Sequence, residues 1–173
     1  MLEKFGCDDE MKNEVADESS SEVVGEDSKD WKYIRVPGLG FLPGLLCPHH
    51  DKVQSNGVLR ANDFDQMLAK HKGERGIGID HWAALIVSEG KYKVLSLEDK
   101  IGSVVIDPQN EHKPAFQAGE GIPGIWIKDV MEDGKIHTRL CPQEGNLIDL
   151  LRPATEIIQD ERVEQCRLAN PSR

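Results

Sequence analysis

Glycine and proline interrupt this chain so often that its apolar segments are only a few residues long. The 173 residues include 16 Gly and 9 Pro, and only 5% are aromatic. Such frequent interruption excludes a coiled coil and is typical of a turn-rich domain built from short elements. The length suits one domain with a sizeable core, because a globular chain of this size buries roughly two-thirds of its unfolded surface.

Acidic residues concentrate at the beginning of the chain. Residues 1–30 hold eleven Asp or Glu and three Lys, so they carry −8 of the formal net charge of −10. Low apolar content combined with high charge is typical of disorder. We therefore predict an acidic disordered arm or loop over 1–30 and an ordered domain over 31–173. This charge balance also argues against a nucleic-acid partner, because phosphate would be repelled.

The sequence indicates a cytoplasmic protein without membrane contact or cofactor. No run approaches the roughly 20 apolar residues of a membrane span, and no apolar stretch typical of a signal peptide follows the first four residues. The cysteines at positions 7, 47, 141 and 166 include no C-x-x-C pair. That spacing disfavours a zinc knuckle or a thioredoxin-type motif and indicates free thiols in a reducing compartment.

The segments after residue 31 alternate between predicted short strands and loops. Strands are predicted at 31–36, 38–44, 76–80, 83–87, 92–97, 102–106, 126–130 and 136–140, with hairpin turns at 88–90 and 132–135. A helix is predicted from Asn62 or Asp63 to Gly73, with Phe64, Met67 and Leu68 on one apolar face. Residues 107–124 form a predicted loop, and 147–168 are predicted to be helical on either side of Pro153.

Two polar clusters accompany predicted short strands. His49, His50 and Asp51 come soon after the first strand, and Asp80 and His81 end the second. Strand ends hold functional side chains firmly while leaving them accessible. His49 is therefore a candidate base, and Asp80 could orient its imidazole. His81 could act as a second base or as a ligand. Surface histidines in a turn, with Asp80 as a turn cap, are the structural alternative. Imidazole and carboxylate suit zinc or iron, but the spacing matches no known metal motif, so no metal is predicted.

No side chain is placed as a nucleophile beside these histidines. A histidine base in acyl transfer needs such a partner, and the chain contains no G-x-S-x-G elbow. Ser103 lies inside an apolar strand pattern. Cys47 lies only two residues from His49, and neighbours along an extended chain rarely converge on one substrate atom.

Several segments together resemble the second half of a dipeptidase E-type serine peptidase, to which cyanophycinase is a more distant relative. They are GLGFLPGLLCPHHD at 38–51, Arg60, GIGID at 76–80 and AALIV at 83–87, and the resemblance covers about residues 31–107. It implies an α/β fold of the class I glutamine-amidotransferase-like (flavodoxin-like) type with β-hairpin additions. The fold would be truncated, with 31–173 as its C-terminal part, because the half that carries the serine elbow is absent.

The resemblance implies roles for five residues. His49 takes the place of the catalytic base, and Asp80 matches the Asp of a G-I-D-E-like motif. His81 stands where many members carry the Glu that serves as the triad acid, so Asp80 and His81 are alternative acids. Arg60 takes the place of an Arg that is either structural or at the edge of the site. Arg60 and His50 are the predicted substrate-binding residues, with His50 in place of an aromatic ring.

The implied function is serine-type hydrolysis of short peptides, with a small peptide as the substrate of a full-length form and no activity in this chain alone. The alternative is a catalytically inactive binding or interaction module. Loss of the first strands would also expose the edge of a central strand, which promotes aggregation unless another segment covers it.

Overall fold

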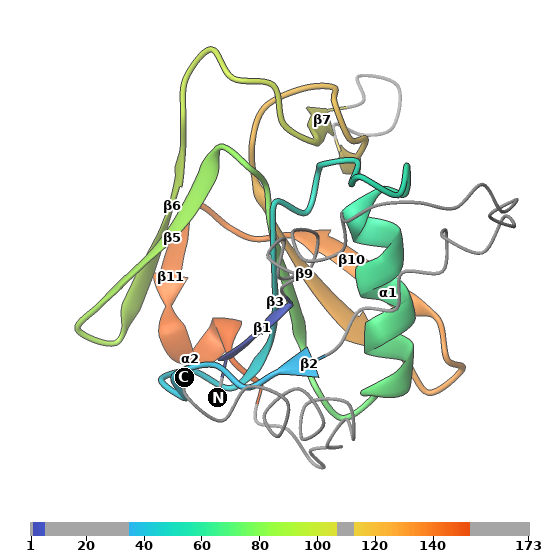
Figure 1. Ribbon diagram of the computed structural model, residues 1–173. Coiled ribbons are helices and arrows are strands. Elements are labelled where there is room, and N and C mark those ends of the chain that lie inside the picture. Colours follow the sequence, from blue (N-terminus) through green and yellow to red (C-terminus); the bar gives the residue numbers. More distant parts are fainter. Residues whose placement is uncertain (1, 6–34, 107–112, 153–173) are drawn as a thin grey trace, which may run out of the picture.

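The computed structural model describes residues 2–5, 35–106 and 113–152, which form a mixed α/β fold made mostly of strands (Figure 1). The elements are β1 (Leu2–Phe5), β2 (Arg35–Val36), β3 (Gly44–Pro48), α1 (Arg60–Lys70), β4 (Gly76–Ile79), β5 (Ala83–Ser88), β6 (Lys91–Ser96), β7 (Val104–Ile106), β8 (Pro114–Phe116), β9 (Ile125–Val130), β10 (Ile136–Leu140), β11 (Glu144–Asn146) and α2 (Leu147–Leu150). None of the helices in these ranges has the length and apolarity that a membrane crossing requires.

A six-stranded sheet in the order β10-β9-β4-β3-β1-β2 forms the centre of the molecule. Strand β3 runs parallel to both β1 and β4, and the other neighbouring pairs are antiparallel. In the β3–β4 ladder, Pro48 lies opposite Ile79. The carboxyl ends of these two strands therefore meet at one edge, where the two predicted polar clusters begin.

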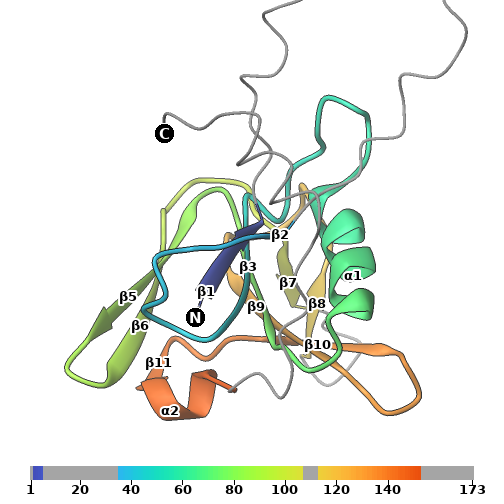
Figure 2. The same cartoon turned by 60° about the horizontal axis from the view of Figure 1, so that its bottom comes forward.

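Helix α1 covers one face of this sheet (Figures 1 and 2). Its buried residues are Ala61, Phe64, Met67 and Leu68, and a hydrophobic cluster joins the last three to Leu45, Cys47 and Val130. The predicted apolar face is confirmed, because the 3.6-residue period brings these positions to one side. The helix begins at Arg60, before the predicted Asn62, and its last residue is Lys70.

A three-stranded sheet in the order β11-β6-β5 lies on the opposite side of the central sheet (Figure 1). The second hydrophobic cluster fills the space between the sheets, with Ile77, Ile125 and Ile127 from one sheet and Tyr92 and Val94 from the other. The predicted β5–β6 hairpin is confirmed. Its turn residues Glu89 and Gly90 both have positive φ, at 50° and 72°, as a two-residue type I′ turn requires.

The remaining predicted elements divide into confirmed and incorrect ones. The predicted strands that correspond to β4, β7, β9 and β10 are present. The predicted strand at 38–44 is wrong. That segment is a loop in which Leu39 is 87% exposed and Phe41 83% exposed, and the strand begins only at Gly44. The predicted loop over 107–124 contains the short strand β8.

The prediction of a disordered arm over 1–30 is wrong for Leu2–Phe5, which form β1 between β2 and β3. Because β1 pairs with β3, it also covers the central edge that was expected to be exposed.

Residues 6–30 lie outside the described residues. The predicted strand at 31–36 is described only at Arg35–Val36, and the predicted helical region at 147–168 only at 147–152, where α2 ends at Leu150. The glutamine-amidotransferase-like fold stays a prediction.

Candidate functional site

His49 and His81 form a close pair at the carboxyl ends of β3 and β4. Their Nδ1 atoms are 2.6 Å apart, and their ring centroids are separated by 4.6 Å. At this distance one nitrogen donates a hydrogen and the other accepts it. The structure thus brings together two of the three residues predicted to be catalytic, at an exposed position.

The backbone at His49 adopts a left-handed conformation with φ of 52°. This conformation costs a non-glycine residue roughly 1 kcal/mol, and the surrounding turn holds it in place. The His49 carbonyl accepts a hydrogen bond from the Lys52 amide at 3.0 Å, and the His50 amide donates to the Ile79 carbonyl at 2.9 Å. The chain therefore leaves the strand abruptly after Pro48, and consecutive side chains diverge.

Asp80 is a buried structural residue. Its Oδ2 atom accepts hydrogen bonds from the Ser103 amide at 3.0 Å, the Ser103 hydroxyl at 2.7 Å and the Gly124 amide at 2.9 Å. The Ser103 hydroxyl in turn accepts one from Trp126 Nε1 at 2.8 Å. The prediction that Asp80 orients His49 is therefore incorrect, because this carboxylate instead joins the end of β4 to the segments that precede β7 and β9.

His50 also lies inside the core, which contradicts its predicted place at a substrate-binding edge. The ring is completely buried, with Phe64 at 6.1 Å and Phe116 at 4.8 Å between ring centroids. A Cβ atom on Gly78 would lie 2.6 Å from the ring, so the glycine leaves room for it. Burial lowers the pKa of His50, and the nearby Asp80 carboxylate, 3.9 Å from Nδ1, only partly opposes this effect. A neutral, enclosed imidazole cannot contact a ligand from solvent.

Arg60 links the beginning of α1 to the end of β3. Its Nη1 atom donates a hydrogen bond to the Pro48 carbonyl at 3.3 Å. This contact fixes the helix beside the histidine turn and agrees with the structural alternative for Arg60, while its role in substrate binding stays a prediction.

Among the described residues, no side chain near the histidine pair is an activated nucleophile. Cys47 is fully buried, its Sγ lies 3.8 Å from the Pro48 carbonyl, and burial strongly raises the pKa of its thiol. The Ser103 hydroxyl is buried and hydrogen-bonded to Asp80 and Trp126. Nor, over the same described ranges, do three His, Cys, Asp or Glu side chains gather in a group that could hold a metal ion.

The β5–β6 hairpin carries an exposed apolar surface, which we call the outer face and which was not predicted from the sequence. Its members are Trp82, Ala84, Ile86, Leu95 and Leu97, all of which are exposed. Ala84 lies opposite Leu95 in the ladder, and the Leu97 amide donates a hydrogen bond to the Trp82 carbonyl at 2.9 Å. The continuous apolar run of β5 was the sequence signal for this surface, because apolar and polar residues normally alternate in a strand that has one solvated face.

Comparison with known proteins gives one informative match. The chain is 33% identical over 162 residues to the G2/mitotic-specific cyclin-1 of Trypanosoma brucei brucei, and the match covers 92% of the chain and 44% of that protein. The chain thus spans less than half the length of this relative. No protein-family model matches the chain, and no solved structure matches it.

This match corrects the family resemblance inferred from the sequence. The matching protein is named as a cyclin, and nothing in the comparisons points to a dipeptidase E-type peptidase. The prediction of serine-type peptide hydrolysis, with a small peptide as substrate, is contradicted by the same finding. The alternative of a non-catalytic interaction module agrees with it better.

Proposed function

We propose that this chain is a non-catalytic module that binds a protein partner in cell-cycle regulation. The observation that carries the proposal is the outer face, where apolar side chains on two neighbouring strands are exposed together. Contiguous exposed apolar residues with charged neighbours are typical of protein interaction sites. Lys100 lies at one margin of this surface, with its Nζ 5.1 Å from the centroid of a Trp82 ring.

The surroundings of the histidine pair support a non-catalytic role. A histidine base in covalent catalysis needs a nucleophile within hydrogen-bonding reach. Over the described ranges, the buried thiol of Cys47 and the hydrogen-bonded hydroxyl of Ser103 do not meet this requirement. The name of the matching relative suggests cyclin-dependent kinases as the first class of partner to test.

Binding of the purified full chain to a panel of purified cyclin-dependent kinases tests the partner. Leu95→Asp should weaken binding by at least about tenfold, because an interface would bury the introduced charge. Ile148→Asp is the matched control, since Ile148 is an equally apolar, exposed residue on α2. Equal affinities of wild type and Leu95→Asp, or no binding to any kinase, would contradict this proposal.

Catalysis is tested separately with a panel of short peptides and a fluorophosphonate probe for reactive serine. No turnover and no labelling are expected. Hydrolysis that His49→Ala abolishes would overturn the non-catalytic assignment.

A further inference from the structure

Strand β5 leaves one edge of the three-stranded sheet open. Among the strands of the described ranges it pairs with β6 alone, and the hairpin turn makes Ser88, Ile86 and Ala84 the residues that bond to β6. The backbone amides and carbonyls of Leu85 and Val87 therefore point away from β6. Within residues 2–5, 35–106 and 113–152 these groups have no hydrogen-bonding partner.

This edge lacks the features that normally protect an open strand. Natural edges carry charges, proline or bulges that prevent another strand from pairing. The β5 sequence AALIVS contains neither a charge nor a proline. Ile86 is 46% exposed and Val87 is 39% exposed, on opposite faces of the strand. An edge of this kind can accept an added strand.

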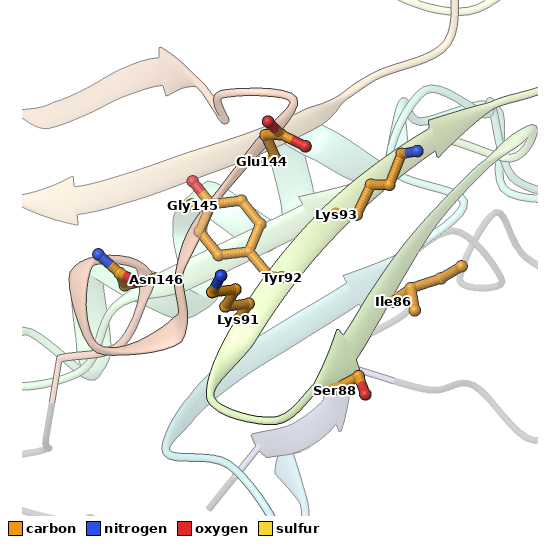
Figure 3. A pocket seen from close by; sticks show the side chains of 8 residues that line it. All are labelled: Ile86, Ser88, Lys91, Tyr92, Lys93, Glu144, Gly145 and Asn146. Carbon is orange, nitrogen blue, oxygen red and sulfur yellow. The ribbon is translucent and has the colours of Figure 1, made fainter.

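The neighbouring strand supplies positive charge beside this edge. Lys93 lies opposite Ile86 and Lys91 opposite Ser88, on the same face of the sheet. Both lysines are exposed, and in the described part of the chain neither forms an ion pair. They line a shallow hollow of about 480 Å³ together with Ile86, Ser88, Tyr92, Glu144, Gly145 and Asn146 (Figure 3).

Glu144 does not cancel this charge completely. It lies opposite Lys93 in the β6–β11 ladder, but Figure 3 shows the Lys93 ammonium directed away from the Glu144 carboxylate. Two exposed lysines therefore line the hollow in a chain whose formal net charge is −10. A strand added to β5 would be separated from β6 by β5 itself, so each ammonium group would reach an acidic side chain across β5, and exposed ion pairs of this kind contribute roughly 0–1 kcal/mol each.

We propose that β5 accepts an extended segment of the partner protein as a fourth strand of the β11-β6-β5 sheet. The segment carries acidic side chains on the face that Lys91 and Lys93 share with the outer face, and apolar side chains on the opposite face, beside Val87. Backbone hydrogen bonds to Leu85 and Val87 provide affinity, and the alternating side chains provide specificity. This inference rests on the proposed protein-binding function and specifies its surface and partner chemistry.

A second copy of this chain is a poorer occupant of the edge. Self-pairing would bring another β5 strand, and its AALIVS sequence has no carboxylate to meet the two lysines. Charge complementarity therefore favours an acidic segment from a different protein.

The test uses the full chain and a fluorescent ten-residue peptide that alternates Glu with Val, with a Gln-for-Glu peptide as the matched probe. Fluorescence anisotropy should show saturable, salt-sensitive binding of the acidic peptide. The Lys91→Gln/Lys93→Gln double variant should weaken binding about tenfold. Lys70→Gln/Lys135→Gln is the control, because both of these lysines are exposed and outside the hollow.

Val87→Pro tests the backbone contact directly. It removes an amide that points away from β6, so the β5–β6 ladder can persist while strand addition is blocked. Val87→Thr is the control that keeps the amide. Wild-type peptide affinity in Val87→Pro, or no binding of the acidic peptide to the wild-type chain, would overturn the proposed strand addition.

The two proposals can fail separately. Kinase binding that is lost in Leu95→Asp but unchanged in Val87→Pro would retain the protein-binding function and reject the β5 edge. Concentration-dependent dimerisation that Val87→Pro abolishes would identify a second copy as the occupant and reject the acidic partner segment.

Discussion

The Nδ1 atoms of His49 and His81 lie 2.6 Å apart, although 32 residues separate them in the chain. The parallel pairing of β3 and β4 produces this contact, because it aligns Pro48 with Ile79 and brings the two strand ends together. The neighbouring residues have different surroundings. His50 and Asp80 are both buried. This edge of the sheet therefore carries one exposed pair, His49 and His81, and one buried pair, His50 and Asp80.

The histidine pair should show a measurable but small coupling energy. A double-mutant cycle with His49→Ala and His81→Ala should give about 0.5–1.5 kcal/mol of coupling in the free energy of unfolding, as expected for one hydrogen bond. Chemical denaturation of the four proteins measures it. Strictly additive single changes would show that the two imidazoles do not interact in solution.

The Asp80 carboxylate should contribute to stability rather than to any reaction. Asp80→Asn should lower the free energy of unfolding by about 1–3 kcal/mol, because the buried donors of Ser103 and Gly124 lose a charged acceptor. Ser103→Ala should be destabilising as well, since it leaves the Trp126 indole N–H without its acceptor. Urea titration measures both effects. Glu120→Gln, at an exposed residue, is the control, and an Asp80→Asn protein as stable as this control would contradict the prediction.

Burial of His50 predicts a loss of stability in acid. The pKa of His50 in the folded protein lies below its ordinary value of 6.5, chiefly because burial disfavours the charged ring. The unfolded chain therefore takes up a proton near that pH while the folded chain does not. Stability is retained above about pH 6.5 and falls as the pH drops below it, by up to about 1.4 kcal/mol per pH unit from this group.

Denaturation curves of His50→Leu across this range should show a smaller loss than those of wild type. His137→Leu, in the exposed part of β10, is the matched control and should follow wild type. An equal acid sensitivity of His50→Leu and His137→Leu would exclude His50 as the cause.

The two described cysteines should resist thiol reagents in the folded protein. Both are buried, and burial raises the pKa of both thiols, although a hydrogen bond with Tyr92 partly opposes the effect at Cys141. Because the thiolate is the reactive form, a Cys7→Ser/Cys166→Ser variant should react slowly with a disulfide reagent until guanidinium unfolds it. Rapid labelling of Cys47 in the native protein would contradict its buried position.

Local sequence patterns predicted most of the regular structure. The spacing of Phe64, Met67 and Leu68 predicted the buried face of α1, because a helix of 3.6 residues per turn brings these positions together. The β5–β6 and β9–β10 hairpins were predicted from apolar runs separated by short turns. The loop around Leu39 and Phe41 misled this reasoning, because its apolar composition matches a buried strand although both side chains face solvent.

The sequence by itself determined that polar residues follow β3 and β4, since this depends only on the order of residues within short segments. Only the tertiary structure decided that His49 meets His81, that Asp80 and His50 turn into the core, and that β5 is an edge strand within the described part of the chain. Each of these outcomes depends on strand order and on partners dozens of residues away. No local pattern records such long-range pairing, because burial and hydrogen bonding at one residue are set by whichever distant segment packs against it.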